Sequence, residues 1–283
     1  MSALLGVLLG GRLGYMLFYN LDAFLDNPLV FFHFLDGGMA SHGGIIGLIV
    51  FTLVYARRKH ISWRGIGDNL CTAAPLGLFF GRMANFINGE LYGRKAEVAW
   101  AVQFPEEIRE PDFSSPTGAG RAALEHDLQP FDLPPAQLAA DGKTVLYDNT
   151  AVIEAVGEID GVKEVLRDYL NARHPSQIYQ ALMEGLALFL ILYFVRVRYP
   201  TLRHGILTGI FFIGYAVFRI LGEQFREPSD GFIGAFTRGQ FLSLFMVLIG
   251  GAFVASAYIW PYRQKLSKRL RRSNSRAEAA DDG

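Results

Sequence analysis

The sequence predicts an all-α polytopic membrane protein with six transmembrane helices and a small, irregular α+β arm outside the membrane. Of the 283 residues, 51% are hydrophobic and 23 are phenylalanine. The apolar residues come in blocks of about 20, the length a helix needs to cross the hydrocarbon core of a bilayer. Lysine and arginine gather in alternate loops between these blocks, as they do in membrane proteins of fixed orientation.

Each apolar block is long enough to cross as a helix with its backbone groups bonded internally. The first block has no basic residue ahead of it and no clear cleavage site, so we expect a spanning helix there and not a signal peptide. The predicted spans are 1–19, 37–56, 66–88, 178–197, 205–227 and 239–260.

The basic loops fix the expected orientation. Lysine and arginine concentrate in 57–64, in 196–203 and in the tail after Trp260. These segments are therefore expected in the cytoplasm, with residues 89–177 on the outer face. The sequence thus predicts a multi-pass protein of the bacterial cytoplasmic (inner) membrane with a cytoplasmic C-terminus.

The segment 89–177 differs in composition, with sixteen acidic and eight basic residues. Within it, 148–170 is expected to form a short strand followed by a helix. We predict four regions: membrane helices with a lipid headgroup site (1–95), an extracytoplasmic arm (96–173), further membrane helices (174–262) and a basic, then disordered, tail (263–283).

The composition excludes several classes of protein. The charged residues balance at 27 basic and 27 acidic, so the net charge indicates no nucleic-acid partner. One cysteine cannot form an internal disulfide, and the sequence has no Cys/His spacing typical of a metal site. Cys71 lies in an apolar stretch without an activating neighbour, so we assign it to core packing.

Charged residues inside predicted spans are costly and therefore mark candidate sites. The alternative for each is a structural ion pair or a side chain that reaches the headgroups. Glu184 in particular is expected to pair with an arginine. The residues concerned are Arg12, His42, Arg82, Glu184, Arg219 and Glu223.

The end of the third span combines four such groups. Arg82 and Asn85 share a helix face at a spacing of three residues, and a guanidinium fork fits phosphate. Asn88 and the glycines that flank Glu90 predict a helix break. Glu90 and Arg94 then lie in a turn just outside the membrane.

Two further clusters lie in other spans. In the fifth, Arg219 and Glu223 are four residues apart, and Arg226 is expected on the same helix face. The second span opens with a glycine-rich segment around His42 and Gly43, where a backbone can approach a ligand closely. His42 is a candidate general base because imidazole titrates near neutral pH.

These motifs, in this order, resemble the prolipoprotein diacylglyceryl transferase family. The matching segments are GGRLGYMLFYN (10–20), DGGMASHGG (36–44), GRMANFINGELYGR (81–94), HPSQIYQALMEG (174–185) and FRILGEQFREP (218–228). The resemblance implies an enzyme that moves a diacylglyceryl group from phosphatidylglycerol to the lipobox cysteine of a preprolipoprotein. It implies release of glycerol 1-phosphate, and no cofactor or metal.

The residue patterns and the resemblance together give a set of expected site residues. Expected catalytic residues are His42, Arg82, Arg219 and Glu223. Expected substrate-binding residues are Arg82, Asn85, Asn88, Glu90, Gly93, Arg94, Gly43, Arg226 and Asp68.

The chain departs from the family pattern in two places. The family usually has seven spans, and the six here suggest that the first is missing. Gln180 stands where the family often has glutamate. Two alternatives stay open: a lipid or anion transporter (flippase), whose inverted repeats we do not find, and an inactive, N-terminally truncated fragment.

Overall fold

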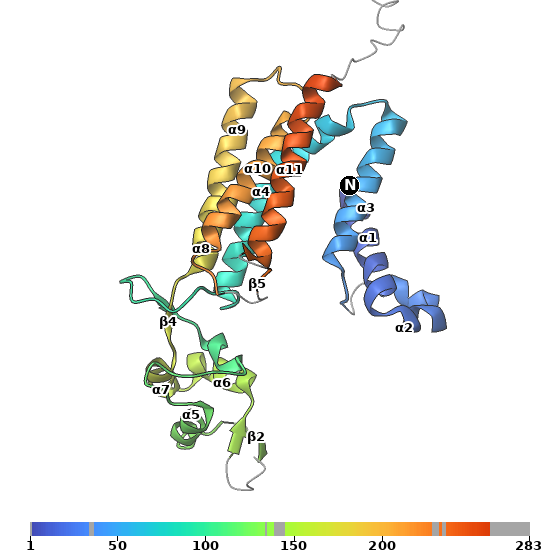
Figure 1. The fold of residues 1–283 in the computed structure, drawn as a ribbon. Coiled ribbons are helices and arrows are strands. Elements are labelled where there is room, and N and C mark those ends of the chain that lie inside the picture. Colours follow the sequence, from blue (N-terminus) through green and yellow to red (C-terminus); the bar gives the residue numbers. More distant parts are fainter. Residues whose placement is uncertain are drawn as a thin grey trace, which may run out of the picture. The chain divides into compact units, whose positions relative to one another are not determined.

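The computed structural model describes residues 2–33, 37–133, 135–138, 145–227, 232–233 and 236–260 (Figure 1). The chain divides into two compact units. The first contains 1–72, 196–210 and 251–283, and the second contains 73–195 and 211–250. The predicted tail, 263–283, lies outside the described residues.

Two glycine-rich helices form most of the first unit. In chain order its N-terminal elements are α1 (Ser2–Tyr19), α2 (Leu21–Asp26), the 3-10 helix η1 (Pro28–Phe32) and α3 (Ser41–Lys59). A Cβ on Gly43 would lie 2.3 Å from the carbonyl oxygen of Gly10, and a Cβ on Gly47 would lie 2.1 Å from that of Gly6. Gly43 thus lets the α1 and α3 backbones touch.

Arg12 is buried in α1 with 2% of its surface exposed. Its guanidinium donates to the backbone carbonyls of Val30 (2.7 Å) and Phe31 (3.2 Å), and also to those of Gly37 and Gly38. Both glycines have a positive φ, 77° and 78°, a conformation that glycine adopts without strain. Arg12 therefore holds the segment that leads into α3, a structural role that is neither an ion pair nor a headgroup contact.

Asp68 has a structural role in the first unit as well. It is 5% exposed and accepts hydrogen bonds from the backbone N–H of Gly205 (2.7 Å) and Thr208 (2.8 Å), and from the Thr208 hydroxyl (2.8 Å). These donors lie at the start of α10 (Ile206–Gly222). The carboxylate therefore satisfies donors that a helix N-terminus leaves unpaired.

Long apolar helices dominate the second unit. They are the C-terminal part of α4 (Trp63–Ile87), the continuous run of α8 (Ser176–Gln180), the π-helical segment η4 (Ala181–Ala187) and α9 (Leu188–Arg198), and parts of α10 and α11 (Arg238–Ile259) (Figure 1). Gly185 of η4 packs on Phe79 of α4, where a Cβ would lie 2.7 Å from the Phe79 Cα. Gly214 of α10 packs on Leu188, so α4, η4, α9 and α10 are neighbours.

Three helices among the described residues are long and apolar enough to cross a membrane: Trp63–Ile87, Ser176–Arg198 and Gly239–Ile259. Leu4–Tyr19 and Ile206–Gly222 are shorter apolar helices. The predicted fifth span, 205–227, was too long, because the helix ends at Gly222 and a turn follows. The membrane-protein class is confirmed, and the count of six spans stays a prediction.

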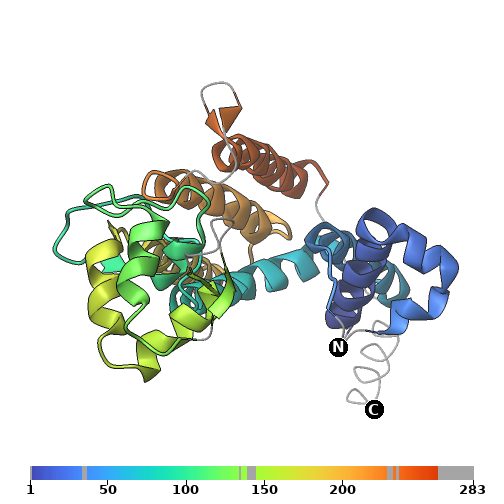
Figure 2. The same cartoon turned by 90° about the horizontal axis from the view of Figure 1, so that it is seen from below.

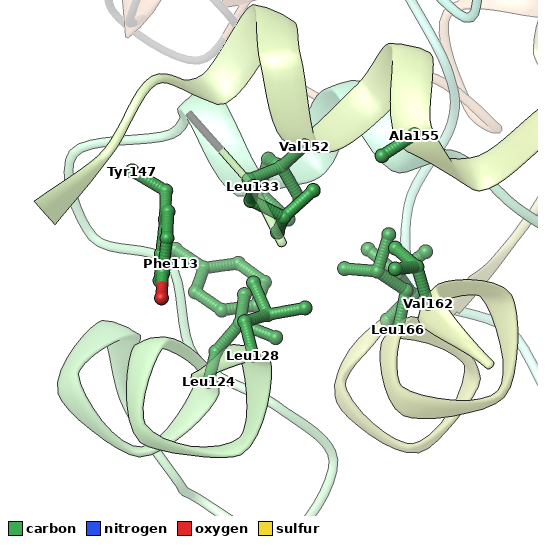
Figure 3. Close-up of a cluster of buried hydrophobic side chains, with 11 residues drawn as sticks. Phe113, Leu124, Leu128, Leu133, Tyr147, Val152, Ala155, Val162 and Leu166 are labelled. Atoms are coloured by element: carbon green, nitrogen blue, oxygen red, sulfur yellow. The ribbon is translucent and has the colours of Figure 1, made fainter. Parts of the chain in front are cut away.

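The arm carries a hydrophobic core of its own. Its helices are η3 (Pro105–Arg109), α5 (Arg121–Leu128), α6 (Asn149–Glu158) and α7 (Val162–Tyr169), coloured green to yellow-green in Figure 2. Three of these helices, α5, α6 and α7, surround buried side chains that point toward one another (Figure 3). The labelled members are Phe113, Leu124, Leu128, Leu133, Tyr147, Val152, Ala155, Val162 and Leu166.

Short antiparallel strand pairs complete the second unit. They are β1 (Val102–Gln103) with β4 (Ala172–Arg173), β2 (Pro135–Leu138) with β3 (Val145–Tyr147), and β5 (Phe232–Ile233) with β6 (Phe236–Thr237). The strand predicted to begin at Asp148 was wrong. Asp148 is instead the N-cap of α6, and its carboxylate accepts from the Thr150 N–H at 3.2 Å.

Candidate active site

Arg82 and Asn85 lie near the C-terminal end of α4, where the helix stops. The Gly89 N–H donates to the Phe86 carbonyl (3.1 Å), and the Glu90 N–H donates to the Asn85 carbonyl (2.8 Å). Gly89 has a φ of 71°. This pair of bonds around a left-handed glycine is the Schellman motif, which ends helices. The predicted break after Asn88 is therefore confirmed.

Gly93 sits where three chain segments cross. Its N–H donates to the His174 carbonyl (2.9 Å), and the Arg94 N–H donates to the Phe225 carbonyl (3.0 Å). A Cβ on Gly93 would lie 2.4 Å from the Phe225 oxygen and 2.7 Å from the His174 oxygen, so only glycine fits. The crossing ties the segment after α4 to the chain just before α8 and just after α10.

Glu184 is the centre of the charged cluster. It lies in η4 and is fully buried, with 0% of its surface exposed. One carboxylate oxygen is 3.5 Å from an Arg82 nitrogen, and the other is 3.7 Å from an Arg219 nitrogen. The expected pairing of Glu184 with an arginine is confirmed, and it involves two arginines.

Arg219 has a second carboxylate on its own helix turn. Its other terminal nitrogen is 3.4 Å from Glu223, four residues further on, as the spacing predicted. Glu223 is 7% exposed and lies against the start of α11, where a Cβ on Gly239 would come within 3.0 Å of it. Two arginines and two glutamates thus balance to zero net charge within this cluster.

The cluster holds most of the unsatisfied polar atoms of the described residues. Six buried side-chain nitrogen or oxygen atoms of the described residues make no hydrogen bond. One belongs to Asn149 in the arm, and the other five belong to Gln177, Gln180, Glu184, Arg219 and Glu223. The atoms from Glu184, Arg219 and Glu223 are the ones that form the long ion pairs described above. Since buried polar atoms are normally hydrogen-bonded, the cluster is a candidate site for a polar ligand.

The remaining rim residues follow the helix break. Asn88 and Glu90 are exposed, and the Asn88 amide donates to the Glu90 carboxylate at 3.3 Å. The Arg94 guanidinium donates to the Arg226 carbonyl at 2.9 Å. Arg226 lies beyond the end of α10 and forms a β-bridge with Gly93. The prediction that Arg226 shares a helix face with Arg219 was therefore wrong.

A second buried ion cluster joins the arm to these helices. Arg173 is 2% exposed and contacts the carboxylates of Glu107 (2.7 Å), Glu110 (3.3 Å) and Glu227 (2.9 Å). Its guanidinium also lies 4.8 Å from the centre of the Tyr92 ring. Burial and the neighbouring Glu110 carboxylate raise the pKa of the Tyr92 phenol, which donates to Glu110 at 2.5 Å. This cluster anchors the chain just ahead of α8.

The structure thus brings together Arg82, Arg219 and Glu223, with Gly93, Arg94 and Arg226 meeting at the crossing. His42, Gly43 and Asp68 belong to the first unit. There His42 is an exposed residue of the first turn of α3.

Sequence reasoning missed Tyr215 and Gln177, and it noted Gln180 only as a departure from the family pattern. The phenol of Tyr215 interacts electrostatically with Glu184, Arg219 and Arg82. Gln177 and Gln180 are each 1% exposed, and the Gln177 amide donates to the Glu90 carbonyl at 2.6 Å. Amides and a tyrosine in a span are common enough that no local pattern singles them out. Ser176 is the first residue of α8 and donates to the Leu91 carbonyl at 3.1 Å.

Comparisons with known proteins agree with the motifs. The profile of the prolipoprotein diacylglyceryl transferase family matches residues 1–256. A protein of Erwinia tasmaniensis named phosphatidylglycerol--prolipoprotein diacylglyceryl transferase is 38% identical over 275 residues, which cover 95% of this chain and 78% of the relative.

Two more relatives carry the same name. That of Azospirillum brasilense is 40% identical over 261 residues, covering 90% of this chain and 75% of the relative. That of Proteus mirabilis is 39% identical over 263 residues, covering 92% and 74%. The family match spans most of the chain, and these alignments cover most of each relative. This chain therefore belongs to the prolipoprotein diacylglyceryl transferase family.

Proposed function

We propose that this chain transfers the diacylglyceryl group of phosphatidylglycerol to the lipobox cysteine thiol of a preprolipoprotein and releases glycerol 1-phosphate. Family membership supports the reaction. The main structural support for this reaction is the pair of guanidinium groups, from α4 and α10, that contact the buried carboxylate of Glu184. Partly buried arginines suit a phosphodiester, because the planar fork binds phosphate oxygens in pairs.

The proposed chemistry is a displacement at carbon. The substrate thiolate attacks the glycerol carbon that bears the phosphate ester, so a C–S bond forms and the C–O bond breaks. The bonding electrons move onto the phosphate oxygen. The proton lost by the thiol offsets the negative charge that the released phosphate gains. Arg82 and Arg219 stabilise the charge that grows on that oxygen.

We assign removal of the thiol proton to His42, because an imidazole titrates near neutral pH and the thiolate is the nucleophile. Glu223, just past the end of α10, orients Arg219 at 3.4 Å. We assign binding of the headgroup and the peptide to the remaining residues of the expected site. They are Gly43, Asp68, Asn85, Asn88, Glu90, Gly93, Arg94 and Arg226.

The setting of the enzyme is a bacterial membrane. We propose the inner membrane, six spans and a cytoplasmic C-terminus, from the alternation of basic loops. In this arrangement 1–95 and 174–262 form the membrane part and 96–173 the outer arm. The basic tail, 263–283, lies inside the cell.

The test is a transfer assay with the purified protein in phosphatidylglycerol vesicles and a synthetic lipobox peptide. The peptide should gain the mass of one diacylglyceryl group for each glycerol phosphate released. A peptide with serine in place of the lipobox cysteine should give neither product. Movement of phosphatidylglycerol between leaflets without headgroup release would point to a transporter, and no reaction at all would refute the enzyme.

A further inference from the structure

Glu184 makes contacts that a simple structural ion pair would not need. It is the one carboxylate that the described residues place against both Arg82 and Arg219. We infer that Glu184 is a positioning residue, which holds these two arginines together as a single phosphate-binding pair. This role rests on the proposed function and adds to it a residue that acts through the arginines.

The two arginines depend on Glu184 unequally. Arg219 also contacts Glu223, which directly follows the last residue of α10, at 3.4 Å. Arg82 contacts no other carboxylate within 4 Å among the residues that the structure describes. Removing the charge of Glu184 would therefore release Arg82 and leave Arg219 tied to Glu223. The pair would lose its fixed separation, although both positive charges would stay.

The contacts are long for charge-assisted bonds. Such bonds between nitrogen and carboxylate oxygen usually measure about 2.7–2.9 Å, whereas those from Glu184 measure 3.5 and 3.7 Å. One Glu184 oxygen and one Arg219 nitrogen make no hydrogen bond. Arginines held this loosely keep donors for a phosphate that enters between them.

The backbone around Glu184 restricts the position of its side chain. Residues Ala181–Ala187 form a π-helical segment, and such segments are frequently found at functional sites. The next residue, Gly185, packs directly on the α4 backbone at Phe79, three residues before Arg82. On the other side, a Cβ on Gly222 would lie 3.7 Å from a Glu184 oxygen, which places the carboxylate against α10.

The net charge of the cluster predicts an effect on ligand binding that a purely structural ion pair would not show. The four charges of the cluster sum to zero, so a phosphodiester that binds there competes with Glu184 for the arginines. With glutamine at this position the cluster carries one net positive charge. An anionic ligand should bind more tightly, while the misaligned arginines should stabilise the transition state less well.

The experiment compares kcat and KM for phosphatidylglycerol in wild-type enzyme, Glu184→Gln and Glu184→Asp. For Glu184→Gln we expect KM to fall roughly 5- to 10-fold, the low end of the effect of one charge at this distance. We expect kcat to fall about 10- to 100-fold, as for misplaced catalytic groups. Glu184→Asp keeps the charge and should recover part of kcat, with a KM closer to wild type.

Inhibition by glycerol 1-phosphate gives a second readout on the same variants. Its inhibition constant should fall together with KM in Glu184→Gln. Binding of glycerol 1-phosphate, followed by calorimetry, does not need turnover. If the wild-type protein catalyses no transfer but Glu184→Gln still binds this phosphate more tightly, the proposed function fails and the arrangement of the arginines stands.

A matched control is available in the arm. Glu125 is also a buried carboxylate, 3.0 Å from Arg121. Glu125→Gln should lower the melting temperature and leave KM unchanged, since it removes an ion pair of structural value only. An unchanged kcat in Glu184→Gln, or a raised KM, would overturn the inference. If Glu184→Gln does not fold, kcat and KM are measured for Glu184→Asp instead. Values equal to wild type in that variant would overturn the inference.

Discussion

At the scale of single residues, the candidate site contains two arginines and two glutamates whose charges sum to zero, on apolar helices. An isolated charge within a span is costly, and Arg82 and Arg219 avoid that cost by sharing Glu184. The spacing of residues 219 and 223 predicted one of these pairs correctly. It could not predict the partner of Arg82, because α4 contains no acidic residue one turn away and Glu184 is 102 residues distant in the sequence.

Replacing either arginine by lysine should slow transfer strongly. A lysine keeps the charge but loses the planar fork that binds two phosphate oxygens. Loss of one charge-assisted contact of about 2–3 kcal/mol corresponds to roughly 30- to 150-fold slower turnover. We predict this range for Arg82→Lys and for Arg219→Lys, measured as diacylglyceryl transfer to a lipobox peptide.

The double variant tests whether the two arginines serve one phosphate. Groups that share a ligand are not independent, so their effects should combine to less than the sum in free energy. Strict additivity would argue for two separate anion sites. A rate near wild type in either single variant would remove that arginine from the site.

At the scale of the elements, glycines decide how close two backbones come. Gly43 lets α3 touch α1, and Gly93 lets the chain pass between His174 and Phe225. The sequence suggested that glycines around His42 allow a ligand to approach the backbone. In the first unit Gly43 approaches a neighbouring helix instead.

Gly93→Ala should disturb the crossing of the three segments. The new methyl group would meet two backbone oxygens, which cannot move aside as a flexible side chain can. Overpacking of this kind costs about 1–3 kcal/mol, and the displaced Arg94 and Arg226 backbones should reduce transfer as well. Thermal unfolding and the transfer rate measure the two effects. Gly157→Ala in helix α6 is the control, because a Cβ there meets nothing within 4 Å. An equal loss of stability and transfer rate in both variants would contradict the crowding argument.

Asp68 offers a test between a structural and a substrate role. Its carboxylate accepts three hydrogen bonds at the start of α10. Asp68→Asn keeps the shape but loses the negative charge and one acceptor oxygen, so stability should fall by about 1 kcal/mol. KM for phosphatidylglycerol should not change if the role is capping. A raised KM with an unchanged melting temperature would instead support the substrate contact that the family motif implied.

At the scale of the whole molecule, the alternation of basic loops makes a prediction that can be measured directly. In a Cys71→Ser background, a cysteine replacing the exposed Glu154 of α6 marks the arm, and one replacing the exposed Lys59 at the end of α3 marks a basic loop. A membrane-impermeant thiol reagent added to intact spheroplasts should label the first position and not the second. Labelling of the arm only after the membrane is opened would reverse the proposed orientation.

The sequence by itself determined the family, the membrane class, the helix break after Asn88 and the pairing of Arg219 with Glu223. All of these depend on composition, on ordered motifs or on spacings of a few residues along one helix, where geometry follows from the helical repeat. Only the tertiary structure decided the features that join distant segments. Glu184 reaches Arg82 from another helix, Asp68 caps a helix that begins 138 residues later, and Gly93 fits between two remote carbonyls. Such contacts arise from how the helices pack, and no local pattern encodes which side chains will then meet.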